Sequence, residues 1–381
     1  MSGMRSRLMK SAILALLVIT GAGSAWGLPI APTGPLTFDI LAPYGYWLGG
    51  LIPSGAGATL LYRLPRLFPG GDTILEEDIA AGWQSNYFYR NSDGTTYGGA
   101  DLLPTIFDQA EILNSIGVRQ GIDLQPLATQ DSVEGFLFFR IHYDHNFASS
   151  GNPNPLVFRS SLPDRVEVLG NTVHIGLAYD SMANDAIHGT VDGAYAELSL
   201  EYGPRFLLNA DGSSDFYRIN GTVEYFRTLF RSPQTGDRNS FSVYAADYLA
   251  VDYLGGGSIP IYAMESFGGR CPRTSVDTMV VRGFEPGRLD AATKVLNQLE
   301  IRICGPSIAG RDFIPGIYAF VDGAYCADRV DDPGIFASTG LGLFVDCFRL
   351  LNCTAYLAHP FGGSEGPGAF AVLGASLHLA F

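Results

Sequence analysis

The last residues of the chain alternate strictly between apolar side chains and small or polar ones, and they end on an aromatic residue. Leu377, Leu379 and Phe381 occupy every second position, and Ser, His and Ala stand at 376, 378 and 380. Successive side chains of a strand point to opposite faces, so this pattern predicts a strand with one wholly apolar face that runs to the end of the chain. Such a face requires an apolar medium against it.

The first residues read as a cleaved export signal, which we assign to residues 1–27. Arg5, Arg7 and Lys10 form a basic start, residues 12–20 form a short apolar core, and small residues follow. No later segment has the run of about 20 apolar residues that a spanning helix needs. In an exported chain, a final strand that stops on an aromatic residue is typical of bacterial outer-membrane β-barrels. We therefore expect residues 28–381 to form such a barrel in the outer membrane, in contact with its lipid.

The composition agrees with this expectation but does not prove it. Charged residues make up 16% of the chain, which also holds 47 Gly, 24 Phe and 19 Tyr. A transmembrane barrel places apolar residues against lipid and polar ones in its lumen, so neither kind dominates locally. A secreted soluble β-sandwich would share most of this composition. The net charge of −14 argues against a nucleic-acid partner, which needs a basic face.

Strand-like segments recur along the chain, separated by clusters of Gly, Asn, Asp, Ser and Pro. Two stretches are ambiguous, because residues 101–118 have a weak helical period and residues 290–299 also suit a helix by propensity. The segments that we predict as strands are Thr59–Pro65, Gly135–Tyr143, Thr172–Tyr179, Gly193–Gly203, Asp215–Phe230, Asn239–Leu254, Ser258–Phe267, Lys294–Cys304, Phe313–Tyr325, Ala337–Cys347, Cys353–Phe361 and Phe370–Phe381.

The connections between the last predicted strands alternate in length. Residues 305–312 are shorter than the next connection, residues 327–336, and residues 348–352 are shorter than the one that follows them, residues 362–369. If the final strand ends on the periplasmic side, the short turns fall in the periplasm and the longer loops lie outside the cell. Outer-membrane barrels have this arrangement.

The sequence Val281-Arg282-Gly283-Phe284 lies in a long connection, and Glu300 and Asp322 follow on the next two predicted strands. Together with the ending of the chain, these residues resemble the BamA/TamA-type barrels, also called the bacterial surface antigen family. The match is specific over residues 279–381. The resemblance implies a barrel of sixteen antiparallel strands. It also implies that the sixth extracellular loop folds into the lumen, where its arginine pairs with Glu300 and Asp322.

The strand period supports this constellation independently of the resemblance. Alternation places Glu300 on one face of its strand, and it places Asp322 on the same face as Phe320. Two neighbouring carboxylates repel each other, and a guanidinium between them would relieve this repulsion. We expect Gly283 to allow a sharp tip, and Phe284 to stack on lumen aromatics such as Tyr318 or Phe320. We interpret Phe320 and Gly323 as marking a strand turn.

The resemblance is to a family whose assembly and translocation members carry periplasmic POTRA domains, and this chain leaves no room for one beside a full barrel. We expect a barrel-only relative that acts in protein or lipid insertion, in transport or in outer-membrane organisation, with a separate periplasmic protein as a candidate partner. A general porin or small-solute channel is the alternative. An outer-membrane lipid enzyme is less favoured, because the Gly-x-Ser-x-Gly sequence at Ser364 lies between two strands and lacks the helix that a hydrolase elbow needs. We expect no enzyme activity.

The remaining candidate sites involve cysteine and histidine. Cys347 and Cys353 flank a five-residue turn, and Cys271 and Cys326 both fall on the predicted outer side, so each pair is a candidate disulfide in an exported chain. His142, Asp144 and His145 crowd one strand end, and His142 and Asp144 share a face. A metal site is conceivable there, but ordinary solvation of a strand end is commoner. We expect neither a metal nor a cofactor.

Overall fold

The computed structural model describes sixteen stretches of the chain. It contains no helix that is both long enough and apolar enough to cross a membrane, as far as the described residues go. The described residues are 36–47, 50–52, 56–68, 71–88, 105–123, 132–148, 167–185, 190–209, 214–232, 241–270, 281–284, 289–308, 313–327, 334–347, 351–361 and 368–380. The export signal and Phe381 lie outside them.

These stretches form one helix and a series of strands. The helix α2 (Ile261–Glu265) follows β11. The strands are β1 (Leu36–Trp47), β2 (Gly50–Ile52), β3 (Ala56–Phe68), β4 (Gly71–Phe88), β5 (Thr105–Gly121), β6 (Ser132–Ala148), β7 (Glu167–Asp180), β8 (Ala183–Asp185), β9 (Thr190–Gly203), β10 (Asp215–Arg231), β11 (Ser242–Ser258), β12 (Thr293–Cys304), β13 (Phe313–Cys326), β14 (Ile335–Cys347), β15 (Leu351–Phe361) and β16 (Gly368–Ala380).

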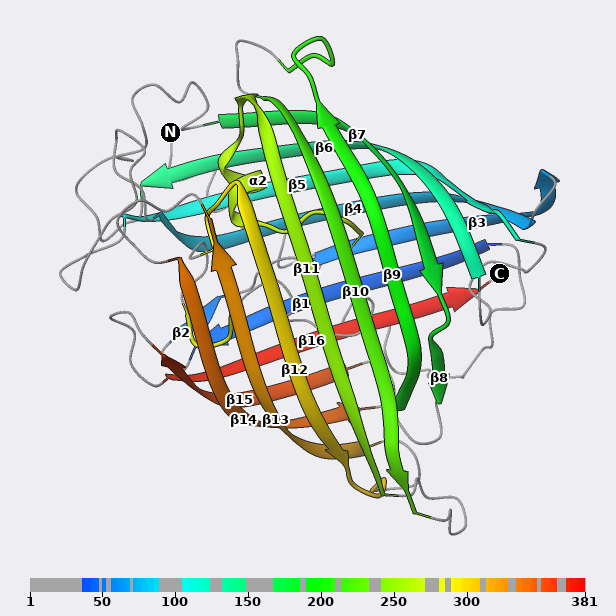
Figure 1. Ribbon diagram of the computed structural model, residues 1–381, viewed down its shortest axis with the longest axis vertical. Coiled ribbons are helices and arrows are strands. Elements are labelled where there is room, and N and C mark those ends of the chain that lie inside the picture. The colour runs from blue at the N-terminus through cyan, green and yellow to red at the C-terminus, as the bar shows by residue number, and fades with distance from the viewer. Residues whose placement is uncertain are drawn as a thin grey trace.

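All the strands belong to one antiparallel arrangement that wraps into a barrel (Figure 1). Neighbours in sequence pair with each other, β16 pairs with β1, and β9 pairs with β10, so that the order of strands returns to its start. β2 and β8 have three residues each and extend a hairpin rather than span the wall. Fourteen strands of the described chain therefore build the wall, where the resemblance implied sixteen.

The wall is apolar outside and charged inside. On β9, Leu198 is 64% exposed, whereas its neighbours Glu197 and Ser199 are 5% and 4% exposed. The same alternation runs along β10, β11, β12 and β13. A soluble protein would bury the leucine and expose the glutamate. This inverted pattern is what a strand requires when one face meets lipid and the other meets a polar lumen.

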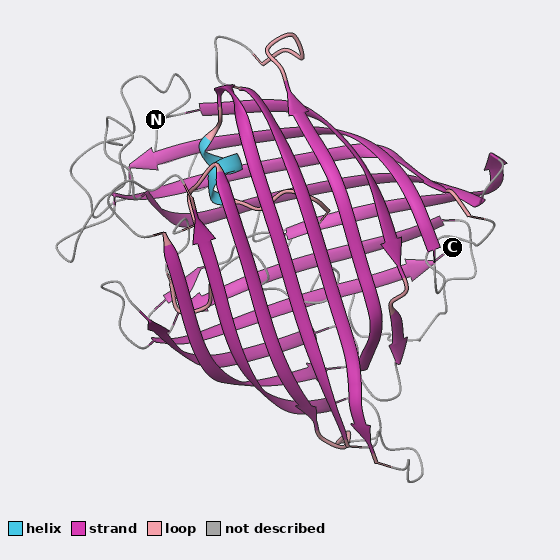
Figure 2. Ribbon diagram, in the orientation of Figure 1, coloured by secondary structure: helices cyan, strands magenta, loops and turns pink. Residues whose placement is uncertain are grey.

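One expectation about local structure needs correction, and two stretches that the sequence left ambiguous are resolved. The segment Ser258–Phe267, predicted as a strand, instead leaves the sheet after Ser258 and forms the one-turn helix α2 (Figure 2). Pro260 has no N–H for strand pairing, and its carbonyl accepts hydrogen bonds from Ala263 and Met264. Of the two ambiguous stretches, residues 105–118 belong to β5 and residues 293–299 belong to β12, because pairing on both edges overrides their weak helical preference.

The predicted disulfide between Cys347 and Cys353 is wrong, since both residues carry thiols. The strand register explains this, because Cys347 pairs with Leu351 and Cys353 pairs with Val345. The two cysteines are therefore diagonal neighbours, whose Cα atoms typically lie about 7–8 Å apart. That separation exceeds the usual reach of a disulfide. Cys326 is buried on β13, and its proposed partner Cys271 lies outside the described residues.

Candidate functional site

We call the connection between β11 and β12, residues 259–292, the inner connection; its described parts, residues 259–270, 281–284 and 289–292, pack against the inner face of the wall. Its tip, residues 281–284, is buried throughout, and Val281 and Arg282 are 1% and 3% exposed. Val281 and Phe284 join an apolar cluster with wall residues of β11, β12, β13 and β14. A tip that packs against four wall strands is part of the protein interior rather than a surface loop.

The guanidinium of Arg282 lies between the two predicted acids; we call these three residues the Arg282 cluster. Nε donates to Oδ2 of Asp322 at 2.8 Å and Nη2 donates to Oδ1 at 2.6 Å, which makes a bidentate pair. The backbone N–H of Arg282 also donates to Asp322, at 2.9 Å. Nη1 forms an ion pair with Glu300. Side chain and backbone together hold the tip against β12 and β13.

Glu300 and Asp322 face the interior because side chains alternate between the two faces of β12 and β13. Glu300 pairs in register with Phe320, and both are buried, whereas Leu299 and Val321 on the opposite faces are exposed. Glu300 also pairs with Arg302 of its own strand. The face assignment made from the sequence therefore agrees with the structure, and it brings all three residues of the Arg282 cluster together.

Aromatic packing at the tip differs from the expectation. Phe284 packs edge-on against Phe336, with ring centroids 5.3 Å apart, and not against Tyr318 or Phe320. The guanidinium of Arg282 occupies that place instead, 3.8 Å from the centre of the Phe320 ring. A cation over a desolvated aromatic face gains about 2 kcal/mol. The tip is therefore held by charge and by the π face of a wall residue.

Arg282 keeps its charge in this position. Burial alone would lower the pKa of its guanidinium, but the hydrogen bonds that it donates to Asp322 and the negative charge of Glu300 raise that pKa above its usual value. Arg282 and Arg302 together balance the charges of Glu300 and Asp322, and removal of one member leaves the others uncompensated in a low-dielectric interior.

Gly283 supplies the backbone conformation of the tip, and this gives a first testable prediction. Its φ is +95°, and a Cβ built on it would lie 2.9 Å from the Cβ of Ala358. We expect Gly283→Ala to lower the free energy of unfolding by about 1–3 kcal/mol, because it adds both backbone strain and a steric clash. Urea titration followed by tryptophan fluorescence measures this change.

Gly323 provides the matched control for Gly283. A Cβ on Gly323 would meet nothing within 4 Å, so Gly323→Ala should leave stability nearly unchanged. Equal losses for the two variants would contradict a special role for the tip. Gly323 and Phe320 lie within β13, which continues to Cys326, so their interpretation as a strand turn is wrong.

A second group of charges anchors the inner connection to a different part of the wall. Arg270 forms ion pairs with Glu134 of β6 and, at 3.8 Å, with Glu76 of β4. Arg119 of β5 binds the same two acids, at 2.8 Å to Glu134 and 3.1 Å to Glu76. We call these four residues the Arg270 cluster. The backbone N–H of Arg270 donates to Glu197 of β9.

Wall side chains also hold the backbone near α2. Arg218 donates to the carbonyl of Ala263, Lys294 donates to that of Met264, and Arg140 donates to that of Gly269 at 3.2 Å. Carbonyl groups that leave a sheet and enter a barrel need such donors. The inner connection is therefore fixed at both clusters and along residues 263–269.

The sequence reasoning missed the Arg270 cluster. A signal existed, because alternation places Glu76, Arg119 and Glu134 on inward faces once β4, β5 and β6 are recognised as strands. Because residues 101–118 suited either a helix or a strand, the sequence did not show that Arg119, the next residue, faces inward. That Arg270 reaches these strands depends on the path of the connection, which the residue pattern does not encode.

Other predicted site residues contribute less to this geometry. Leu377 and Leu379 lie in β16 and pair with Ile40 and Phe38 of β1. Phe381, Cys271 and Ser364 lie outside the described residues.

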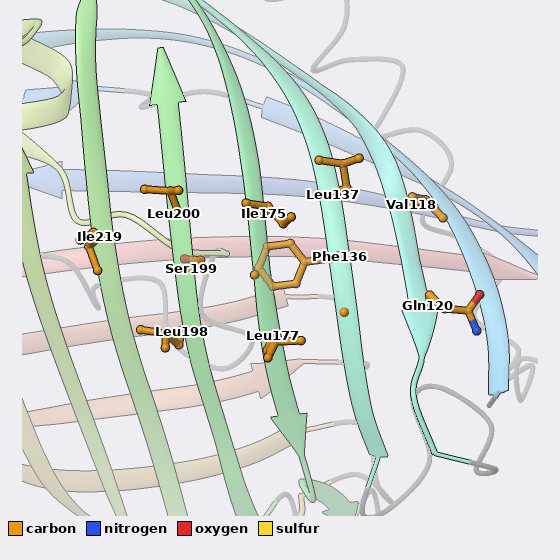
Figure 3. Close-up of a pocket in the computed structure, with 12 residues that line it drawn as sticks. Val118, Gln120, Phe136, Leu137, Ile175, Leu177, Leu198, Ser199, Leu200 and Ile219 are labelled. Carbon is orange, nitrogen blue, oxygen red and sulfur yellow. The ribbon is translucent and has the colours of Figure 1, made fainter. Parts of the chain in front are cut away.

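The wall also has a shallow apolar hollow on its outer face (Figure 3). It is lined by outward-facing side chains from β5, β6, β7, β9 and β10, including Leu137, Ile175, Leu177 and Leu198. Gly135 lacks a side chain at this place and leaves the space. Most of its walls belong to the apolar outer belt, so the hollow opens toward lipid, and Phe136 and Ser199 of the inward face form part of its lining.

Comparisons with known proteins agree with the barrel architecture. No protein-family model and no curated protein sequence matches the chain. Among solved structures, BamA from Haemophilus ducreyi lacking POTRA domains 1–3 is similar at a TM-score of 0.52 and 14% identity, over 90% of this chain and 70% of that one.

Two CdiB structures are also similar to this chain. CdiB from Escherichia coli has a TM-score of 0.55 at 11% identity, and CdiB from Acinetobacter baumannii has 0.52 at 12%. Each match covers 91% of this chain, but only 64% and 60% of the two CdiB chains. At these identities the likeness concerns the fold alone. The chain has the fold of a bacterial outer-membrane β-barrel.

Proposed function

We propose that this chain is an outer-membrane barrel of the BamA/TamA type, with a lumen filled by its inner connection. It would act in the insertion or transport of proteins or lipids, or in the organisation of the outer membrane, without turning over a substrate. The single observation that carries this proposal is the burial of Arg282 between Glu300 and Asp322 on neighbouring wall strands.

The second anchor strengthens the proposal. The Arg282 cluster uses β12 and β13, and the Arg270 cluster uses β4, β5 and β6, with β7, β9, β10 and β11 between the two sets in the wall. A segment tied to two separated parts of the wall crosses the lumen. A general porin needs a water-filled lumen, so these contacts favour a plugged barrel.

Client recognition would rest on a partner. The chain spans 70% of the BamA structure and less than two thirds of the CdiB structures, so the activities of those whole proteins are proposals here. We propose that a separate periplasmic protein receives the clients. Mild crosslinking in native envelopes, followed by capture of this chain, should recover one periplasmic protein reproducibly. Recovery of outer-membrane proteins alone would contradict this part of the proposal.

Conductance in planar bilayers tests the filled lumen. We expect the wild type to show low or flickering conductance, because the inner connection crosses the pore. A variant that lacks residues 261–288 should show a larger and steadier conductance. A large, steady conductance of the wild type that the deletion does not change would instead identify an open porin.

A further inference from the structure

The barrel interior holds a third group of polar residues that neither anchor uses. It consists of Glu111 on β5 and His142 and Asp144 on β6, and one ligand atom from each lies within 4.8 Å of the others. We propose that these three residues bind a divalent first-row metal ion such as Zn²⁺. The proposal does not rest on the function proposed above.

Strand geometry places the three side chains on one inward face. His142 and Asp144 are two residues apart on β6, which puts both on the same side of the strand. Glu111 pairs directly across with Asp144 in the register between β5 and β6. Two carboxylates in directly opposed positions repel each other, so this pair needs a cation between them.

Within the described part of the chain, His142 is the sole basic group at ion-pair distance from these acids. Its Nε2 lies 2.8 Å from Oδ1 of Asp144 and 3.7 Å from Oε1 of Glu111. Every Arg and Lys ion pair of the two anchors uses other acids. A single imidazole, even when protonated, does not balance two carboxylates, whereas a divalent cation does.

The atoms that face each other are also unsatisfied. Nε2 of His142 and Oδ1 of Asp144 are buried, and neither has a hydrogen-bond partner, although they lie 2.8 Å apart. Asp144 is 1% exposed, so water does not supply the missing bond freely. Buried polar atoms without partners are costly, and a shared metal ion would satisfy both at once.

The spacing suits a metal of the zinc class. Imidazole nitrogen and carboxylate oxygen bind Zn²⁺ at about 2.0–2.2 Å, which sets neighbouring ligand atoms about 3–4 Å apart. The distances of 2.8 and 3.7 Å need only small side-chain adjustments to meet this range. One nitrogen and two oxygens leave a coordination position open for water. Imidazole favours transition metals over Mg²⁺ or Ca²⁺.

The site also touches the inner connection. The ring of Tyr262, in α2, stacks on His142 with centroids 3.7 Å apart and planes 11° from parallel. Gly170 of β7 leaves room for the Tyr262 hydroxyl, since a Cβ there would lie 2.2 Å from it. Stacking of this kind fixes the orientation of the imidazole, as ligand histidines generally require.

Metal binding to the folded mature chain in detergent tests the proposal. After treatment with a chelator, the protein is dialysed against Zn²⁺, and the bound metal is counted by mass spectrometry. We expect about one ion per chain in the wild type. His142→Ala and Asp144→Asn should lose this ion or bind it about tenfold more weakly or worse. His145→Ala, one residue away on the opposite face of β6, should bind as the wild type does.

Two readouts keep the result interpretable. The heat-modifiable band on cold detergent gels reports whether each variant has folded, and Asp144→Asn preserves the size of the side chain. Co²⁺ bound to the wild type should show visible absorption without a thiolate charge-transfer band. Absence of bound metal in the folded wild type would overturn the proposal. So would a thiolate band, which assigns the metal to cysteines, or equal binding in all four proteins.

Discussion

The Arg282→Ala variant is expected to lose about 3–5 kcal/mol of folding free energy and to lose its compact, heat-modifiable band on cold detergent gels. The substitution leaves Glu300 and Asp322 buried beside each other with their shared cation removed. It also empties the place over the Phe320 ring that the guanidinium fills. Urea titration of the folded protein in detergent measures the stability, and the gel reports release of the tip.

Two comparisons separate this effect from a general loss of charge. Arg282→Lys keeps one positive charge but cannot make the bidentate pair with Asp322, so it should recover only part of the loss. Arg205→Ala removes an arginine whose pair with Asp215 is exposed, and exposed pairs contribute about 0–1 kcal/mol. If Arg282→Ala behaved like Arg205→Ala, the tip would not be held by its arginine.

The Glu134→Ala variant is expected to have an effect of similar size, about 3–5 kcal/mol, at the other end of the inner connection. Glu134 is 2% exposed and is shared by Arg119 and Arg270. Its removal leaves two guanidiniums with Glu76 as the remaining acid that pairs with both. Urea titration gives the stability, and planar-bilayer recordings should show longer open periods as the Arg270 end of the connection is released.

A double variant that also lacks Arg119 tests whether uncompensated positive charge causes the loss of stability in Glu134→Ala. Arg119→Gln takes away one of the two cations that would otherwise share Glu76, so the double variant should be less destabilised than the sum of the singles, by about 0.5–3 kcal/mol. Asp215→Asn, at the exposed pair with Arg205, is the matched control and should change little. Additive losses at Glu134 and Arg119 would show that the shared charge does not hold the cluster together.

Strand parity made much of the C-terminal wall predictable. Glu300 and Asp322 alternate with exposed apolar residues on β12 and β13, and that alternation is visible in the residue order itself. The position of Arg282 between them followed from the resemblance, which the sequence carries in a few residues. The predicted strands from Lys294 onward differ from the observed ones by a few residues at most.

Contacts between distant segments were not predictable in this way. The partners of Arg270 lie more than a hundred residues earlier in the chain, and residue spacing does not say which wall strands a long connection will reach. The same limit applies to Phe284, which packs on Phe336 instead of the expected rings. The predicted disulfide between Cys347 and Cys353 is wrong because the register between β14 and β15 sets the two cysteines two residues apart instead of opposite each other.

The sequence by itself determined that the chain builds strands with one apolar and one polar face, because a two-residue period is written directly in the order of side chains. It also determined which side chains face inward along each recognised strand. Only the tertiary structure decided that Arg270 of the inner connection pairs with Glu134 of β6, and that Glu111 meets His142 and Asp144. The reason is physical: the path of a connection and the register between strands are set by the packing of the whole wall, and no local pattern specifies them.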